Sequence, residues 1–161
     1  MRGQFVIYPD TPRQIIVPNN VLDEGEETFL KMIARASVAE VAAGGDFFVG
    51  ICGAAFAEDT TLATLVGEPT AAGGYARKAV TRDAVGWPTI SEVNGVWRAQ
   101  TATFTWLPAG AAYDADISRL FLCNVAAGAG GLLFSVSGAL PTAITLADGV
   151  AFPARYELYL R

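Results

Sequence analysis

The side chains that most often perform catalysis are largely missing from this sequence. Its 161 residues include no histidine, which excludes Ser-His and Cys-His nucleophile pairs and removes the usual zinc ligand. A glycosidase needs only two carboxylates, but the acidic residues gather at the start of a predicted helix (23–27) and in predicted loops rather than on facing strands. We therefore expect that the protein is not an enzyme, and no catalytic residue is predicted.

Two cysteines and a pair of aspartates are the remaining candidates for redox or metal chemistry. Cys52 and Cys123 lie in the apolar runs FVGICGA and LFLCNV, a setting typical of buried free thiols; a disulfide is the alternative. Asp114 and Asp116 match a fragment of a calcium loop, but the Gly and the distal Glu of such a loop are missing, which favours an Asx-turn. The sequence thus predicts no metal site and no cofactor.

Three tryptophans lie close together, and exposed aromatic rings bind sugars, bases or protein partners. Trp106 shares a predicted strand face with Phe104, which favours core packing. Trp97 follows a predicted turn by two residues and is the better candidate for the surface. Because tryptophan is enriched at the centre of interfaces, we favour the interpretation of Trp97 as a subunit contact over that of a glycan-binding platform.

The stretch 85–107 positions these tryptophans and contains the clearest structural signal of the chain. Asn94-Gly95 is the dipeptide that best tolerates the two positive φ angles of a type I′ turn, so it predicts a β-hairpin. After the turn, threonines alternate with Ala102, Phe104 and Trp106, which indicates a half-buried strand. The core is therefore expected to be antiparallel β.

A second candidate contact region is the strand predicted over Tyr75–Arg82. Its three basic side chains are typical of an exposed or edge strand that is protected against aggregation. We interpret this edge as a docking surface that presents Tyr75 and Arg77, with an anion site as the alternative.

Residues 1–20 are predicted to form an extended arm. Prolines at 9, 12 and 18 interrupt its two apolar runs, and because proline removes a backbone donor, the runs are expected to pair only at edges or across a subunit boundary. An arm that docks on a neighbour and an edge strand of the same domain are the two interpretations. The residues that the arm, the Tyr75–Arg82 edge and the hairpin offer to a partner are Phe5, Ile7, Tyr8, Ile15, Val17, Tyr75, Arg77 and Trp97.

The rest of the chain, residues 21–161, is predicted to be a single domain. Asp23 and Glu26 resemble a capping box, and apolar residues then recur every three to four positions, which predicts a helix over 23–42. A short helix is predicted over 62–66, and strands over 47–54, 117–125, 132–136 and 156–160. The expected fold is mainly β: an antiparallel β-sandwich or jelly roll with one N-terminal helix and the extended arm.

Composition and charge limit the partners. The net charge is −5 and the basic residues are scattered, so nucleic-acid binding is not expected. No run approaches the ~20 apolar residues of a membrane span, and the N-terminal apolar run is too short for a signal peptide, which predicts synthesis in a reducing cytoplasm. With 52% hydrophobic and 17% charged residues, apolar surface is expected to contact other subunits; a compact sandwich of small residues is the alternative.

The last two-thirds of the chain contain an ordered series of turn and strand motifs. In order, these are Glu68-Pro69, Gly74-Tyr75-Ala76-Arg77 with Val80, Trp87, Phe121-Leu122-Cys123, Gly131-Leu132-Leu133-Phe134, Leu140-Pro141 with Ile144-Thr145, Asp148-Gly149-Val150-Ala151-Phe152-Pro153, and Leu158-Tyr159-Leu160. The series resembles a group of small structural proteins of tailed bacteriophages. Those proteins are jelly-roll-like β domains that serve as capsid decoration, neck components, and tail-tip or fibre modules.

The resemblance implies a virion structural protein that is assembled in the host cytoplasm and has no catalytic residues. Capsid decoration (cement) or a head–tail neck component is the first expectation, acting as a homo-oligomer through contacts with other virion proteins and with copies of itself. The alternative is a tail-tip or fibre adhesin that binds a host surface glycan, for which Trp97 is the candidate platform.

Overall fold

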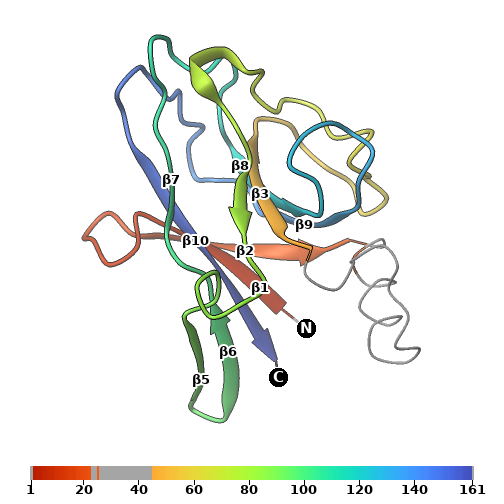
Figure 1. The fold of residues 1–161 in the computed structure, drawn as a ribbon, viewed down its shortest axis with the longest axis vertical. Helices are drawn as coiled ribbons and strands as arrows, with labels where there is room; N and C mark the ends of the chain where they lie inside the picture. The colour runs from red at the N-terminus through yellow and green to blue at the C-terminus, as the bar shows by residue number, and fades with distance from the viewer. Residues whose placement is uncertain (1, 23–24, 26–44, 161) are drawn as a thin grey trace.

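The computed structural model of this protein describes residues 2–22, 25 and 45–160, and strands dominate them (Figure 1). The strands are β1 (Arg2–Ile7), β2 (Ile15–Val21), β3 (Phe47–Cys52), β4 (Lys78–Val80), β5 (Thr89–Val93), β6 (Val96–Gln100), β7 (Phe104–Trp106), β8 (Arg119–Cys123), β9 (Leu133–Ser137) and β10 (Phe152–Leu160), with one 3-10 turn, η1 (Ala72–Gly74).

All strand pairs are antiparallel and belong to one curled sheet. Its order is β4-β3-β8-β9-β2-β1-β10-β6-β5, and β7 pairs with β10 beside β6. This confirms the predicted mainly β, antiparallel class. The helix predicted over 23–42 lies outside the described residues, apart from Gly25.

The predicted N-terminal arm is instead the centre of the sheet. β1 pairs with β2 and with β10, and β2 also pairs with β9. Both strands therefore have a neighbour on each side, and neither forms an edge or an extended arm. Pro18 lies just beyond the last β2–β9 pair, Asn19–Ser137, and its carbonyl accepts a hydrogen bond from Gly138 N at 2.6 Å. The N and O atoms of one strand residue face the same side. The N–H that proline lacks would therefore point past the end of the β2–β9 ladder, where its absence removes no ladder hydrogen bond.

Two apolar clusters pack against opposite faces of the β3–β8–β9 region. Leu120 and Leu122 of β8 belong to the main core, whereas Phe121 and Cys123, on the other face, belong to a smaller cluster that includes Leu62. A strand that is buried on both faces reads as a continuous apolar run, which explains the sequence RLFLC. The loop that contains Leu62 forms a turn at 62–64, so the helix predicted over 62–66 is wrong.

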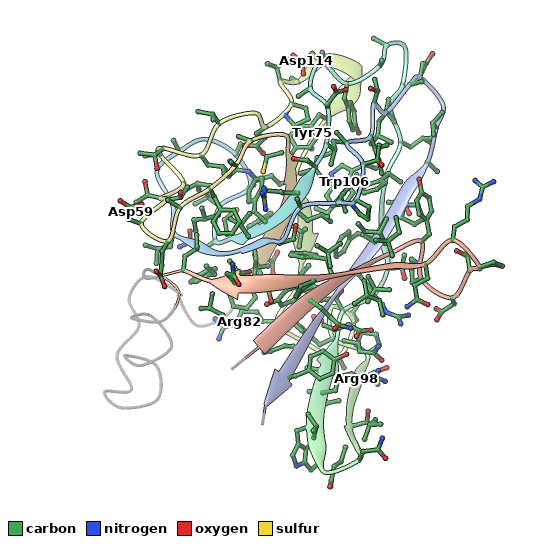
Figure 2. All side chains as sticks on the ribbon, turned by 180° about the vertical axis from the view of Figure 1, so that it is seen from behind. Asp59, Tyr75, Arg82, Arg98, Trp106 and Asp114 are labelled. Carbon is green, nitrogen blue, oxygen red and sulfur yellow. The ribbon has the colours of Figure 1, made fainter. Side chains whose placement is uncertain are left out.

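The hairpin predicted at Asn94-Gly95 is confirmed. Asn94 and Gly95 have φ of 53° and 76°, and Val93 pairs with Val96 across the two-residue turn. The strand predicted after the turn is divided, because β6 ends at Gln100 and β7 begins at Phe104. Phe104 and Trp106 are buried as expected, but Ala102 is exposed, so the alternation does not run through the break. Figure 2 shows the hairpin, marked by Arg98, projecting from the packed body that contains Trp106.

Candidate interaction surface

The hairpin continues the core-facing side of the sheet beyond the region that other elements cover. Leu158 of β10, Ala99 of β6 and Ile90 of β5 lie in one row across the sheet, and Leu158 packs against the main core. Ile90 and Trp97 lie on this same side by alternation, yet they are 68% and 54% exposed. We call this side, with Ile90 and Trp97, the inner hairpin face.

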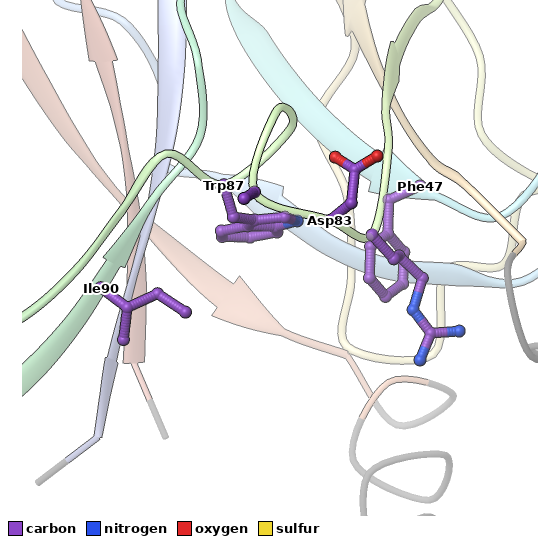
Figure 3. A pocket seen from close by; sticks show the side chains of 6 residues that line it. Phe47, Asp83, Trp87 and Ile90 are labelled. Carbon is purple, nitrogen blue, oxygen red and sulfur yellow. The ribbon is translucent and has the colours of Figure 1, made fainter.

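A pocket of about 360 Å³ adjoins this face (Figure 3). The segments that form it come from three places: the start of β3, the loop after β4, and β5. Two of its six lining residues are aromatic, and the Arg82 guanidinium carbon lies 5.5 Å from the centre of the Phe47 ring. The lining residues are Phe47, Arg82, Asp83, Ala84, Trp87 and Ile90.

The loop before β5 holds Trp87 in place through Asp83. One carboxylate oxygen of Asp83 accepts hydrogen bonds from the Thr81 hydroxyl and from the amides of Val85 and Gly86, and Trp87 N donates to the Asp83 carbonyl at 2.9 Å. The Gly86 and Thr81 bonds lower the pKa of Asp83. The carboxylate therefore stays ionised and serves the turn, while Trp87 packs edge-on against Tyr156 at 6.2 Å.

The residues that the sequence predicted for partner binding are divided by the structure. Trp97 is exposed on the hairpin, and Tyr8 and Ile15 are partly buried against the main core. Phe5, Ile7 and Val17 are buried in that core, at 0%, 0% and 3% exposure. Their apolar side chains therefore contact this chain's own sheet, and a docking role for the three as an arm is wrong.

Tyr75 and Arg77 are engaged within the chain. Arg77 donates to both carboxylate oxygens of Glu68 at 2.7 and 2.8 Å and to the carbonyls of Val125 and Gly128, and its guanidinium lies 5.3 Å from the Phe121 ring centre. Burial is the largest single influence and opposes the charge of Arg77, but its hydrogen bonds to Glu68 and the Coulombic interactions with Cys123, Glu68 and Tyr75 together outweigh burial and raise the pKa. Tyr75 donates to the same carboxylate, and burial raises its pKa. The strand predicted over Tyr75–Arg82 is reduced to β4, at the sheet edge as expected.

This cluster borders a pocket of about 240 Å³ between the loops at 68–77 and 126–128. Because Glu68 already occupies the guanidinium of Arg77 with two hydrogen bonds, the cluster ties these loops together and offers little to an anion. The anion site considered from the sequence has no support in this arrangement.

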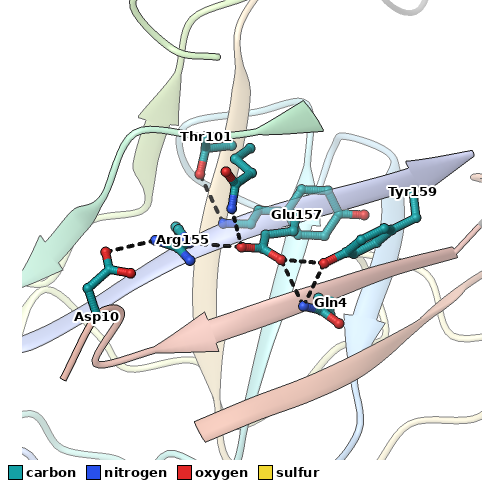
Figure 4. A network of polar contacts seen from close by, with 8 residues as sticks. Gln4, Asp10, Thr101, Arg155, Glu157 and Tyr159 are labelled. Atoms are coloured by element: carbon teal, nitrogen blue, oxygen red, sulfur yellow. Dashed lines mark hydrogen bonds and ion pairs between the residues drawn. The ribbon is translucent and has the colours of Figure 1, made fainter. Parts of the chain in front are cut away.

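The most heavily bonded carboxylate of the described chain is Glu157 on β10 (Figure 4). It is 2% exposed on the side of the sheet opposite the main core, and it accepts from Gln4, Gln100, Arg155 and Tyr159 at 2.5–2.9 Å. Burial raises its pKa, but these four bonds together lower it below the ordinary value. A general acid needs a raised pKa, so Glu157 is suited to joining β1, β10 and β6 rather than to proton transfer.

The remaining candidates for chemistry are also occupied or buried. Cys52 and Cys123 are free and buried, as predicted, and burial raises their pKa, that of Cys52 to about 12. Asp114 accepts from the amide and hydroxyl of Thr70, and Asp116 accepts from the Thr145 hydroxyl, so both join distant loops instead of forming local turns. Within the described ranges, no three Cys, Asp or Glu side chains gather as a metal site would require.

No family model, curated protein or solved structure matches the chain. No helix among the described residues has the length and apolar character that crossing a bilayer requires. The geometry offers surfaces for contact: a pocket that contains two aromatic rings, and a hairpin face on which Ile90 and Trp97 are exposed beside Glu92.

The sequence predicted the exposure of Trp97 but not the pocket. Phe47 is far from Trp87 and Ile90 in the sequence, and it comes near them only because the sheet curls, since β3 and β5 lie near opposite ends of the strand order. The one local signal was Ile90 in the run TISEV, where an apolar residue stands among polar ones on a strand that the Asn94 turn places at the surface.

Proposed function

We propose that this chain is a structural protein of a bacteriophage virion, acting as capsid decoration or as a head–tail neck component through protein–protein contacts. The observation that carries the proposal is a contrast between the buried charged side chains, which bond within the chain, and the exposed apolar side chains. Among the described residues, the buried charged side chains Arg77 and Glu157 are engaged in bonds within the chain. By contrast, Ile90 and Trp97 are exposed, and Ile90 lines a pocket that also contains two aromatic rings. Exposed apolar area of this kind favours binding to other proteins.

A jelly-roll-like or sandwich arrangement is part of the same proposal. Val49 and Leu122, from the β3–β8 region, pack in one core with Phe5 and Phe152 from β1 and β10. A sheet whose separate regions face each other across a common core has the layering of a β-sandwich. Virion shells use such domains as repeated units, which gain stability from many symmetric contacts.

The partners in this proposal are other virion proteins and further copies of the chain, with assembly in the host cytoplasm. The test is mass spectrometry and cryo-imaging of purified particles from a phage that encodes the chain. On the order of a hundred or more copies per particle identifies capsid decoration, and about a dozen or fewer identifies the neck or tail tip. Particles that lack the chain and remain complete and equally robust would overturn the proposal.

A variant pair makes that test specific to the surface. Trp97→Lys places a charge on the inner hairpin face, and we expect it to reduce incorporation into particles. Val85→Lys, at a residue that is 77% exposed outside the face, is the matched control and is expected to be incorporated normally. Equal incorporation of both variants would show that the hairpin face is not the docking surface.

The second candidate is an adhesin of the tail tip or fibre that binds a host glycan, and it is favoured by the exposure of Trp97. An aromatic ring at a projecting tip stacks on sugars as it does on bases. Binding of the isolated chain to a glycan array, lost in Trp97→Ala and kept in Val93→Ala, would support this function over a purely structural one.

A further inference from the structure

β5 leaves an unpaired edge at one end of the sheet. In the described part of the chain, only β6 pairs with it. Natural edge strands are usually short, charged, or interrupted by proline or a bulge. β4, at the opposite end, has three residues and carries Lys78. β5 has five residues; it carries one charge, on Glu92, and its apolar residues Ile90 and Val93 are 68% and 45% exposed.

The hairpin turn determines which backbone groups face this edge. A two-residue turn is closed by a hydrogen-bonded pair, here Val93 and Val96. Hydrogen-bonded and non-hydrogen-bonded pairs then alternate along an antiparallel ladder, so Ser91 and Thr89 also bond to β6. The N–H and C=O groups of Ile90 and Glu92 therefore point away from β6, toward the edge.

We propose that the β5 strands of two copies of this chain pair antiparallel around a two-fold axis, with Ser91 of one copy opposite Ser91 of the other. In this register Ile90 of each copy lies opposite Glu92 of the other. Each such pair exchanges two hydrogen bonds, so the edge-facing groups of both copies are satisfied together. The contact is isologous and closes as a dimer, and the two sheets become one.

Neighbouring registers satisfy fewer groups. With Glu92 opposite Glu92, two carboxylates lie directly across from each other, which is destabilising, and Ile90 falls opposite Asn94 in the turn. With Ile90 opposite Ile90, Glu92 lies opposite Pro88, which has no N–H to donate. The Ser91 register also places the β-branched pair Thr89 and Val93 side by side on one face, and the two Ile90 side chains diagonally on the other.

The test uses the isolated full chain, because pairing requires no other virion protein; its failure would leave the proposed function standing. Sedimentation equilibrium from about 1 μM to about 1 mM is expected to show a reversible dimer. Hydrogen exchange gives the specific readout. The amides of Ile90 and Glu92 are expected to gain protection as concentration rises, while those of Ser91 and Val93 are protected at every concentration.

Two variants at one position separate pairing from folding. Ile90→Pro removes an edge-facing donor without removing a β5–β6 hydrogen bond, and it is expected to weaken dimerisation roughly ten-fold, because the donor is lost in both copies. Ile90→Lys keeps the backbone donor but places two positive charges near the axis, and it is also expected to weaken dimerisation. Val85→Lys, in the exposed loop before β5, is the control and is expected to leave the dimer unchanged.

Three results would overturn the inference. They are a chain that stays monomeric throughout the concentration range, a dimer that Ile90→Pro leaves intact, and a dimer in which the Ile90 and Glu92 amides exchange freely. Protection that appears instead at the edge-facing backbone amide groups of β4 would assign the contact to the opposite edge of the sheet. Glu92→Gln removes two diagonally placed carboxylates and is expected to tighten the proposed dimer.

Discussion

β8 and β6 are both five-residue strands with a sheet neighbour on each side, yet their environments differ completely. Four of the five residues of β8 are buried, because one apolar cluster covers each of its faces. None of the residues of β6 is buried, because the elements that pack on the sheet end before the hairpin. A strand with hydrogen-bonded neighbours on both sides is therefore not necessarily part of the core. It is buried only where other elements pack on its faces.

An aromatic residue in each strand allows the sharpest test of this difference. Phe121→Ala in β8 is expected to lower the free energy of unfolding by about 4 kcal/mol, because it leaves a cavity among fully buried residues. Trp97→Ala in β6 is expected to change it by less than about 0.5 kcal/mol. Urea unfolding measures both. If Phe121→Ala does not fold, Phe121→Leu, with a smaller expected loss, replaces it; equal losses at the two positions would contradict the comparison.

Enlarging a small side chain should also have different effects on stability in the β3–β8 region and in β6. Gly50 of β3 lies opposite Phe121, and a Cβ added there would lie 2.1 Å from the ring. Gly50→Val is therefore expected to cost about 3 kcal/mol, since the ring cannot move without disturbing both β8 and Arg77. Ala99→Val in β6 is the matched insertion and is expected to stay within about 0.5 kcal/mol. A tolerated valine at position 50 would show that the second cluster is loosely packed.

The smallest effect concerns what holds β6 to β10. Glu157→Gln keeps the shape but removes the charge that Gln4, Gln100 and Arg155 donate to, and is expected to cost about 2 kcal/mol near pH 7. Because the pKa of Glu157 is lowered in the folded protein, its stabilisation is present above the ordinary value of 4.5 and is lost as pH falls through the folded pKa.

The difference between wild type and Glu157→Gln is therefore expected to shrink between about pH 7 and about pH 3. Urea unfolding at both pH values measures it, with Glu58→Gln, at an exposed carboxylate in the loop after β3, as the control. A difference that stays constant with pH would mean that shape, rather than charge, joins β6 to β10.

Local chemistry was predictable from the sequence, and long-range pairing was not. The Asn94-Gly95 turn needs only two residues that accept positive φ, so it could be placed without knowing any partner. Residues 1–20 were assigned to an arm because three prolines argue against a central strand. Nothing near Pro18 reveals that its nitrogen faces the end of β9, a strand more than a hundred residues away.

In the candidate site too, local features were predictable from the sequence and long-range contacts were not. The burial of Phe104 and Trp106 follows from strand alternation, and the exposure of Trp97 follows from its closeness to the turn. Arg77 was interpreted as an edge cation, because the sequence does not show that Glu68 folds back onto it. The pocket at Trp87 depends on the curl of the sheet, which no short motif encodes.

β1 and β10 lie side by side although Gln4 and Glu157 are 153 residues apart. During translation, the β1–β2 pair leaves the ribosome with Phe5 and Ile7 uncovered, and β10 follows only after roughly 7–26 s at normal elongation rates. Folding of the sheet is therefore expected to wait until β10 has emerged, and in that interval the nascent chain is most exposed to aggregation and most dependent on chaperones.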